Sequence, residues 1–427
     1  AYDVVEWAGT QDWSSGKVAM CGISYFGMAC YWAAMQQPPH LTAIVPYEAL
    51  TDMYGDTVRQ GGVWHTGFQK HWFNNTIVPQ QYGRNEGLND AQLMKQRFDY
   101  EALQTKWLWR SEGPWPVLDR ERQLAKIKVP ILTAGNWMDS EVHLPGNARS
   151  FEQASSTWKF LEMHTGNHLA AYYDAAQIAR QIQFLDYFLK GKLDNGLESS
   201  PRVELLIRRG AENFYRSEKS WPPQDAVFTP LYLAPMGCLS FEPYTSSTQD
   251  KAIEYAGLTG GSDLFQTDVL NADFEILGYP HLDLTVSTDA RDMDIFVYFY
   301  IIDPSGTKVE VRGNHDEPAV SLLRGWLRLS HRTLSKDSRL DRPMLEQLKP
   351  APVEEDEWYN VKIPMPCTSI LVPKGCRFAV ALQATDEEEI IPPMRHNGPD
   401  RSQELFRGTN RIRLGGKIIL PYVVRGS

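Results

Sequence analysis

The strongest candidate for chemistry is a serine in the segment Cys21–Gly27, which reads CGISYFG. An apolar run at residues 17–21 predicts a strand before it, and an Ala-, Met- and aromatic-rich run at residues 25–36 predicts a buried helix after it. A serine on a tight strand-to-helix turn projects its hydroxyl away from the backbone. Ser24 is therefore the predicted nucleophile, and the Tyr25 amide at the helix N-terminus is the predicted oxyanion donor. The alternative is a Ser/Gly-rich turn that only packs.

A nucleophilic serine needs a base and a carboxylate that orients the base, and two later strand ends supply both. The predicted strand 129–134 is followed by Asp139, and the predicted strand 158–163 is followed by His168. An open α/β sheet places its chemistry at the carboxyl ends of its strands. Asp139 and His168 are therefore predicted to complete a triad with Ser24. Taken singly, Asp139 could be a helix N-cap and His168 a surface loop residue.

Two other histidines compete with His168 for the role of base. His164 lies four residues earlier and nearer the strand, and His143 lies four residues after Asp139 at a predicted helix start. We prefer His168, because the base must reach across the sheet edge from a flexible loop. Lone histidines such as His143 are mostly structural.

The predicted elements around these residues come in the order strand, turn, helix, strand, which predicts a parallel sheet with right-handed crossovers. The fold class is therefore α/β, with an α/β-hydrolase domain over residues 1–198. Residues 52–125 depart from this order: their apolar residues recur at helical spacing and many are aromatic. They are interpreted as a helical cap. Trp64 and Phe68 in this cap, with Trp137, are candidates for the substrate pocket; the alternative is an ordinary helical core.

Beyond residue 198 the pattern changes to short alternating segments separated by Gly, Pro and Asp turns. Many short strands with turn signals predict a jelly-roll β-sandwich, which is assigned to residues 199–427. Residues 234–262 and 333–356 are expected to be long loops.

Composition narrows the choice of partners. The net charge is −10, with 43 Lys and Arg against 53 Asp and Glu, which argues against nucleic acid as a partner. No run approaches the ~20 apolar residues of a membrane helix, so no membrane association is predicted. Five cysteines without CxxC or Cys/His clusters indicate neither a metal site nor a disulfide framework, and no cofactor is expected. Reduced thiols suit a cytoplasmic protein, and a homo-oligomer is left open.

At these residues the sequence resembles the cocaine-esterase and X-Pro dipeptidyl-peptidase family of serine hydrolases. The similarity covers nearly the whole chain and is carried by several motifs: Asp12–Val18, Gly22–Gly27, Pro46–Ala49, Gly135–Asp139, Phe184–Gly191 and Trp221–Pro223. The resemblance implies that Ser24, Asp139 and His168 occupy the triad positions and that the Tyr25 amide is one oxyanion donor. It also implies a C-terminal jelly roll.

Two departures from the family pattern stand out. The family carries Gly-Pro-Trp shortly before its catalytic histidine, where this chain has His164-Thr165-Gly166. In the family, four strands precede the nucleophile strand and a tyrosine from that region supplies the second oxyanion donor. The resemblance therefore implies that this chain is N-terminally truncated and that its strand at 18–21 lies at a sheet edge.

Hydrolysis of an ester or amide through an acyl-enzyme is the leading functional prediction, with a small-molecule ester or amide or a short peptide as substrate. An esterase is favoured over an X-Pro dipeptidyl-peptidase, because a peptidase needs acidic groups for a free α-amino group and the cap offers mostly Trp and Phe. The alternative from another class is an inert hydrolase half attached to a binding module.

Overall fold

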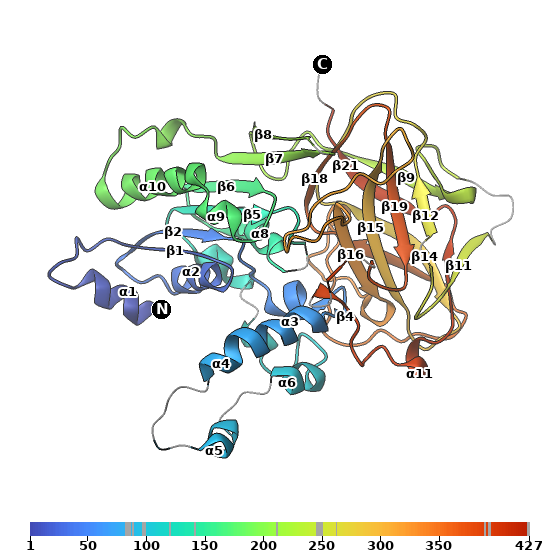
Figure 1. The fold of residues 1–427 in the computed structure, drawn as a ribbon, viewed down its shortest axis with the longest axis horizontal. Helices are drawn as coiled ribbons and strands as arrows, with labels where there is room; N and C mark the ends of the chain where they lie inside the picture. Colours follow the sequence, from blue (N-terminus) through green and yellow to red (C-terminus); the bar gives the residue numbers. More distant parts are fainter. Residues whose placement is uncertain are drawn as a thin grey trace.

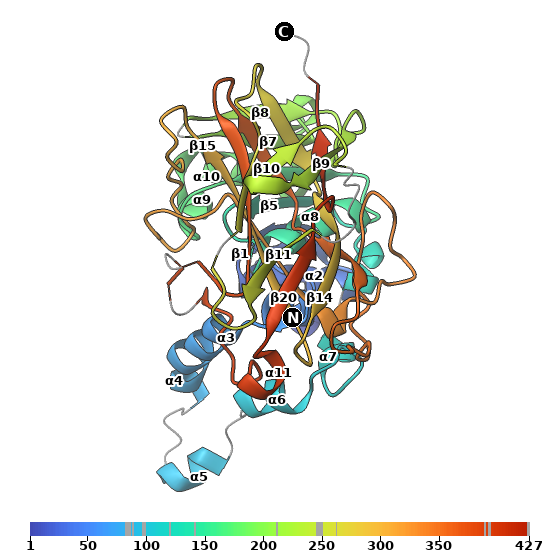
Figure 2. The same cartoon turned by 90° about the vertical axis from the view of Figure 1, so that its right-hand side faces the viewer.

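The computed structural model describes the chain except residues 82–86, 88, 96–99, 119–120, 141, 211, 245–250, 262, 388–389, 392–393 and 425–427. A layered α/β part carries residues up to about 218, and a β-rich part follows it (Figures 1 and 2). The predicted fold class, an α/β-hydrolase domain with a C-terminal β domain, is confirmed.

The α/β part is built on a parallel sheet whose neighbouring strands are paired in the order β1, β2, β5, β6 and β7. The strands span Val18–Ile23, Leu41–Tyr47, Ile131–Asn136, Lys159–His164 and Val203–Arg209, and β8 (Glu212–Glu218) pairs antiparallel to β7. β1 pairs with β2 in the part of the chain that the structure describes, and Cys21 in its middle is exposed. The central sheet thus continues past residue 198, and the division of the chain at that residue stays a prediction.

Helices cover both faces of this sheet (Figure 1). They are α1 (Tyr2–Gly9), α2 (Tyr25–Gln36), α8 (Leu144–Gln153), α9 (Ala170–Tyr173) and α10 (Ala175–Lys190). Adjacent residues of β2 point to opposite faces, so Ile44 packs with α2 while Val45 packs with Phe184 of α10. Both strand faces are therefore buried, as a parallel sheet requires.

The ends of α10 show how local sequence sets a helix boundary. The Asp174 side chain caps the first turn by accepting hydrogen bonds from the amides of Ala176 and Gln177. Gly191 ends the helix in the left-handed conformation, with φ 66°, which a residue without Cβ adopts at no steric cost.

Short helices form the predicted cap between β2 and β5 and extend away from the sheet (Figure 1). They are α3 (Thr66–Trp72), α4 (Val78–Gln81), α5 (Asp90–Lys95), α6 (Tyr100–Lys106) and α7 (Trp115–Leu118), with π-helical turns at Tyr54–Val58 and Phe73–Ile77 and a 3-10 turn at Glu121–Lys126. A small hairpin of β3 (Arg59–Gln60) and β4 (Val63–Trp64) was not expected, because two-residue strands carry no periodic signal.

The β-rich part consists mainly of antiparallel strands with one large apolar core. Its elements are β9 (Val227–Ala234), β10 (Cys238–Ser240), β11 (Ala252–Ala256), β12 (Asp263–Gln266), β13 (Phe274–Gly278), β14 (His281–Thr288), β15 (Asp294–Ile302), β16 (Leu323–Arg328), β17 (Tyr359–Pro364), β18 (Thr368–Val372), β19 (Arg377–Gln383), α11 (Gln403–Phe406), β20 (Thr409–Arg413) and β21 (Lys417–Tyr422). β10 and β11 lie in residues 234–262, so the expectation of a long loop there is wrong. β10 forms a short hairpin with β9, which directly precedes it, whereas the partner of β11 is β20, near the end of the chain.

The two parts share a packed boundary. β15 is buried on both faces: Val297 and Phe299 enter the core of the sandwich, whereas Phe296 and Tyr298 join a cluster that includes Ile44 and Met28 of the α/β part. Arg208 of β7 donates hydrogen bonds to the carbonyls of Leu322 and Ser369 in the β-rich part. The β-rich part therefore holds the carboxyl end of the catalytic sheet.

Candidate active site

Ser24 occupies the turn between β1 and α2, with φ 59° and ψ −128°. A non-glycine residue in this region is strained and persists only where the surroundings hold it. A Cβ on Gly22 would lie 2.5 Å from the Cβ of Phe26, and one on Gly27 would lie 2.7 Å from the Cβ of Ala49. The two glycines are thus required by close packing around the turn, which matches the nucleophile geometry expected from the sequence.

The predicted oxyanion donor sits in the same turn. Tyr25 is the first residue of α2, and amides of a first helical turn have no acceptor within their own helix. The Tyr25 amide is thus placed where it could bind a developing negative charge.

A hydrogen-bonded relay leads from Ser24 to a buried carboxylate through His143. Ser24 Oγ lies 3.1 Å from His143 Nε2, and His143 Nδ1 lies 2.5 Å from Asp139 Oδ2. Asp139 is fully buried, and His143 directly precedes α8. Burial by itself would raise the pKa of Asp139, but the charge and hydrogen bond of His143 hold that pKa well below its usual range. This arrangement can take a proton from Ser24 and stabilise the imidazolium that forms.

His168, the predicted base, lies beside this relay instead of within it. Its ring stacks on that of His143, with centroids 4.9 Å apart and planes 12° apart. Its Nδ1 lies 2.8 Å from Glu48 Oε2 and 3.7 Å from Asp139 Oδ2. Burial lowers the pKa of His168, so the neutral imidazole is favoured. The hydrogen bond that we expected between Ser24 and His168 is made by His143, because the i, i+4 spacing places His143 directly on Asp139.

The loop that carries His168 is fixed by the β-rich part. The His168 amide donates to the Asn314 carbonyl at 2.9 Å, and Asn167 Nδ2 donates to Asp316 Oδ2 at 2.7 Å. The flexible loop expected from sequence is thus anchored at two points, and the β-rich part contributes directly to the site.

The other competing histidine does not reach the nucleophile. His164 ends β6 and is almost fully buried, with Nε2 3.5 Å from Glu48 Oε1. Burial lowers its pKa to about 4. His164 is therefore a neutral residue packed behind the site.

Sequence reasoning missed Glu48 as a site residue, although it lies in the family motif Pro46–Ala49. It directly follows β2 and is fully buried against His168. The available signal was its position at the carboxyl end of a strand next to the nucleophile strand.

The three aromatic residues expected in the substrate pocket do not line the large cavity at the boundary of the two parts. Trp137 is fully buried and donates to the Leu206 carbonyl, and Trp64 is buried and donates to Gln104. Phe68 is half-buried against the main core of the α/β part. Trp64 and Trp137 follow the alternative interpretation, in which such residues are core, because each finds both apolar contact and an acceptor for its indole N–H.

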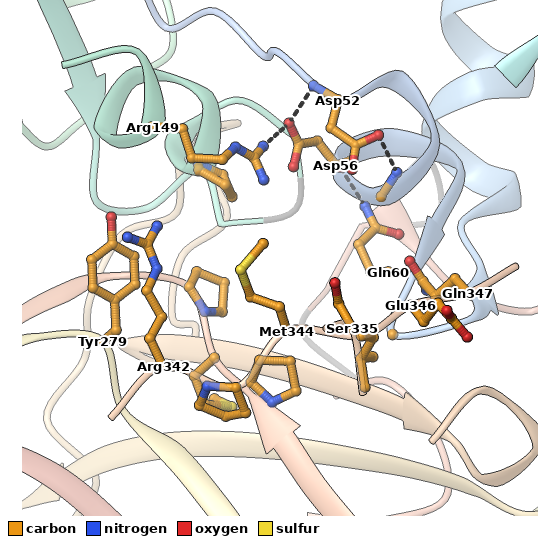
Figure 3. Close-up of a pocket in the computed structure, with 18 of the residues that line it drawn as sticks. Asp52, Asp56, Gln60, Arg149, Tyr279, Ser335, Arg342, Met344, Glu346 and Gln347 are labelled. Carbon is orange, nitrogen blue, oxygen red and sulfur yellow. Dashed lines mark hydrogen bonds and ion pairs between the residues drawn. The ribbon is translucent and has the colours of Figure 1, made fainter. Parts of the chain in front are cut away.

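A large cavity of about 680 Å³ lies at the boundary of the two parts of the chain (Figure 3). Asp52, Asp56 and Arg149 project into it from one side, and Tyr279 and Arg342 from the other. None of Ser24, His143 and His168 lines it, whereas Ser140, next to Asp139, does. The cavity is thus adjacent to the relay but separate from the nucleophile.

Asp139, His143 and His168 each place a possible metal-ligand atom within 4.8 Å of the others. The Asp139 oxygen and the His143 nitrogen already share a hydrogen bond, and the other His143 nitrogen faces Ser24. Asp139 and His143 therefore have partners in the proton relay, and His168 has Glu48.

In the part of the chain that the structure describes, every helix is too short or too polar to span a membrane.

Comparisons with known proteins identify the family of this chain. Residues 1–170 match the X-Pro dipeptidyl-peptidase (S15) family, and residues 195–418 match the C-terminal non-catalytic domain of X-Pro dipeptidyl-peptidases. The chain belongs to this family of serine hydrolases. It is an enzyme of the esterase or X-Pro peptidase type.

Relatives of both types are found within the family. The chain is 24% identical over 503 residues to the cocaine esterase of Rhodococcus sp. (strain MB1 Bresler), covering 100% of this chain and 84% of the relative. It is 25% identical over 280 residues to the Xaa-Pro dipeptidyl-peptidase of Ligilactobacillus salivarius, covering 62% of this chain and 34% of the relative. A solved CocE/NonD family hydrolase from Staphylococcus aureus superposes with a TM-score of 0.86 at 26% identity, covering 99% of this chain and 74% of that one.

Proposed function

We propose that this enzyme hydrolyses an ester with an uncharged acyl group through an acyl-enzyme on Ser24. The observation that carries the proposal is the contact of 3.1 Å between Ser24 Oγ and His143 Nε2, continued to Asp139. Ser24 attacks the carbonyl carbon while His143 takes the hydroxyl proton, and the Tyr25 amide binds the oxyanion. The imidazolium then gives its proton to the leaving alcohol, and water releases the acid by the reverse sequence.

The surroundings of the nucleophile favour an apolar acyl group. Tyr25 and Phe26 are exposed beside Ser24, and Trp72 of the cap meets the Tyr25 ring edge-on at 6.1 Å. An X-Pro peptidase needs a carboxylate for the free amine of its substrate. Glu48 and Asp139, the carboxylates of the relay region, are buried and engaged by histidines. This difference favours the esterase over the peptidase.

The test compares p-nitrophenyl butyrate with Ala-Pro-p-nitroanilide, alongside labelling by a fluorophosphonate probe. We expect labelling at Ser24, a higher kcat/KM for the ester, and loss of both signals in Ser24→Ala. A higher kcat/KM for the dipeptide anilide would support the peptidase instead. Folded wild-type protein that takes up no label would support a non-catalytic module.

A further inference from the structure

Glu48 is a buried carboxylate held rigidly at the end of β2. Its backbone has a φ of 36°, and its amide donates to the Ala134 carbonyl of β5 at 2.7 Å. The next amide, that of Ala49, donates to Asn147 Oδ1 at 2.9 Å. Strained backbone at a fixed position is a feature of functional sites, and Ser24 shows it one strand away.

The partners of Glu48 differ from those of other buried carboxylates in this protein. Glu162, fully buried on β6, lies 3.1 Å from Arg180. Glu48 instead faces two histidines, His168 at 2.8 Å and His164 at 3.5 Å, and the side-chain amide of Asn136 at 3.4 Å. Arginine stays protonated under all ordinary conditions, whereas imidazole exchanges its proton near neutral pH.

The charged and titratable groups around His168 come from several elements. Glu48 follows β2, His164 ends β6, and Asp139 and His143 lie between β5 and α8. His315 of the β-rich part lies with its ring centroid 6.2 Å away. Burial, and then the charge of Asp139, raise the pKa of Glu48 well above its usual range. Two carboxylates and two stacked imidazoles thus share one buried volume, and like charges of either sign oppose each other in it.

We infer that Glu48 is a positioning residue that holds His168 beside His143. The site of Ser24 then contains two carboxylate–imidazole pairs. Asp139 holds His143, and Glu48 holds His168. Because the rings stack at 4.9 Å, a positive charge on one imidazole disfavours a second on the other. Glu48 therefore keeps His168 oriented while His143 carries the proton from Ser24. This inference rests on the proposed function.

A double-mutant cycle tests the pairing. We expect Glu48→Gln to lower kcat for the ester about 100-fold while KM stays within about twofold, because the carboxylate does not contact substrate. In a His168→Ala background, Glu48→Gln should change kcat by less than threefold, because paired residues act as a unit. Glu162→Gln is the matched control, since it also removes a buried glutamate, and it should leave kcat nearly unchanged.

A second readout does not depend on turnover. The imidazole ¹⁵N resonances of His168 in the Ser24→Ala protein report its orientation and its hydrogen bond to Glu48. They should move in Glu48→Gln and stay unmoved in Glu162→Gln. If Glu48→Gln does not fold, Glu48→Asp replaces it and should also move the His168 resonances. Independent, multiplying effects of Glu48→Gln and His168→Ala, or unmoved His168 resonances, would overturn the inference. Moved His168 resonances, together with a wild-type protein that neither labels nor hydrolyses esters, would instead overturn the proposed function alone.

Discussion

Three buried acids, Glu48, Asp52 and Asp56, follow β2 within ten residues, and they have different partners. Glu48, with Asp139, faces the histidines of the relay. Asp52 and Asp56 face the boundary cavity and pair with Arg110 and Arg149 (Figure 3). Buried carboxylates that lie close together in the chain therefore pair either with histidine or with arginine.

The partner decides which purpose a buried carboxylate serves. The guanidinium of Arg110 counteracts the effect of burial and lowers the pKa of Asp52, so that this pair remains an ion pair. An imidazole partner can give up or accept a proton within the physiological range. We conclude that the arginine-paired acids stabilise the α/β part at its boundary cavity, whereas the histidine-paired acids support proton transfer.

The largest effect should follow removal of the nucleophile. Ser24→Ala should lower kcat/KM for a p-nitrophenyl ester at least about 10³-fold, because the relay acts as a unit. The midpoint of thermal unfolding should stay nearly unchanged, since the side chain is small and half-buried. Residual activity within tenfold of wild type would contradict the assignment of Ser24.

The next largest effect separates the two imidazoles. His143→Ala should lower kcat to within about tenfold of Ser24→Ala, because His143 contacts both Ser24 and Asp139. His168→Ala should retain more activity, at about the level of Glu48→Gln, and His164→Ala should lose under tenfold. The opposite order of His143 and His168 would restore the base predicted from the sequence.

A smaller effect, on stability instead of activity, is expected when an arginine-paired acid is replaced. Asp56→Asn removes the partner of Arg149 and weakens hydrogen bonds from the amides of Thr51 and Asp52. We expect a loss of about 3 kcal/mol in the free energy of unfolding, measured by urea denaturation, with kcat within about threefold. Glu404→Gln, which breaks an exposed pair with Arg291, is the control and should cost less than about 1 kcal/mol. A large fall in kcat for Asp56→Asn at full stability would remove the distinction between the two groups.

The effect that is smallest at neutral pH, and grows only on acidification, concerns the buried His164 behind Glu48. Burial lowers its pKa to about 4, whereas the unfolded chain takes up that proton near pH 6.5. The unfolded state therefore gains protons first, and stability falls as the pH drops from 6.5 to 4, by up to about 1.4 kcal/mol per pH unit from this group. His164→Gln should flatten this slope in urea denaturation at pH 6.5, 5.5 and 4.5, and the exposed His71→Gln should not. An unchanged slope in His164→Gln would mean that other groups dominate the acid sensitivity.

Much of the α/β part could be predicted because its signals are local. The apolar strand before Ser24, the breaker-free helix over 25–36 and the capping glycine at 191 are each set within a few residues, and all three form. In the β-rich part, β11 was missed because its partner β20 lies far away along the chain, and the three-residue β10 is too short to show a period. Propensity alone does not reveal such pairing.

The active site likewise combines features that the local sequence predicts with features that depend on distant contacts. By itself the sequence determined the elements that carry the chemistry: a serine on a strand-to-helix turn, an acid after one strand and a histidine after another. Only the tertiary structure decided which histidine reaches Ser24 and which reaches Glu48. His143 meets Asp139 across a short turn, but it reaches Ser24 because β1 and β5 lie in one sheet. Glu48 meets His168 because Asn314 and Asp316 of the β-rich part hold the histidine loop against β2. Hydrogen bonds act over about 3 Å, and residues more than a hundred positions apart reach that distance only when the packing of whole layers brings them together.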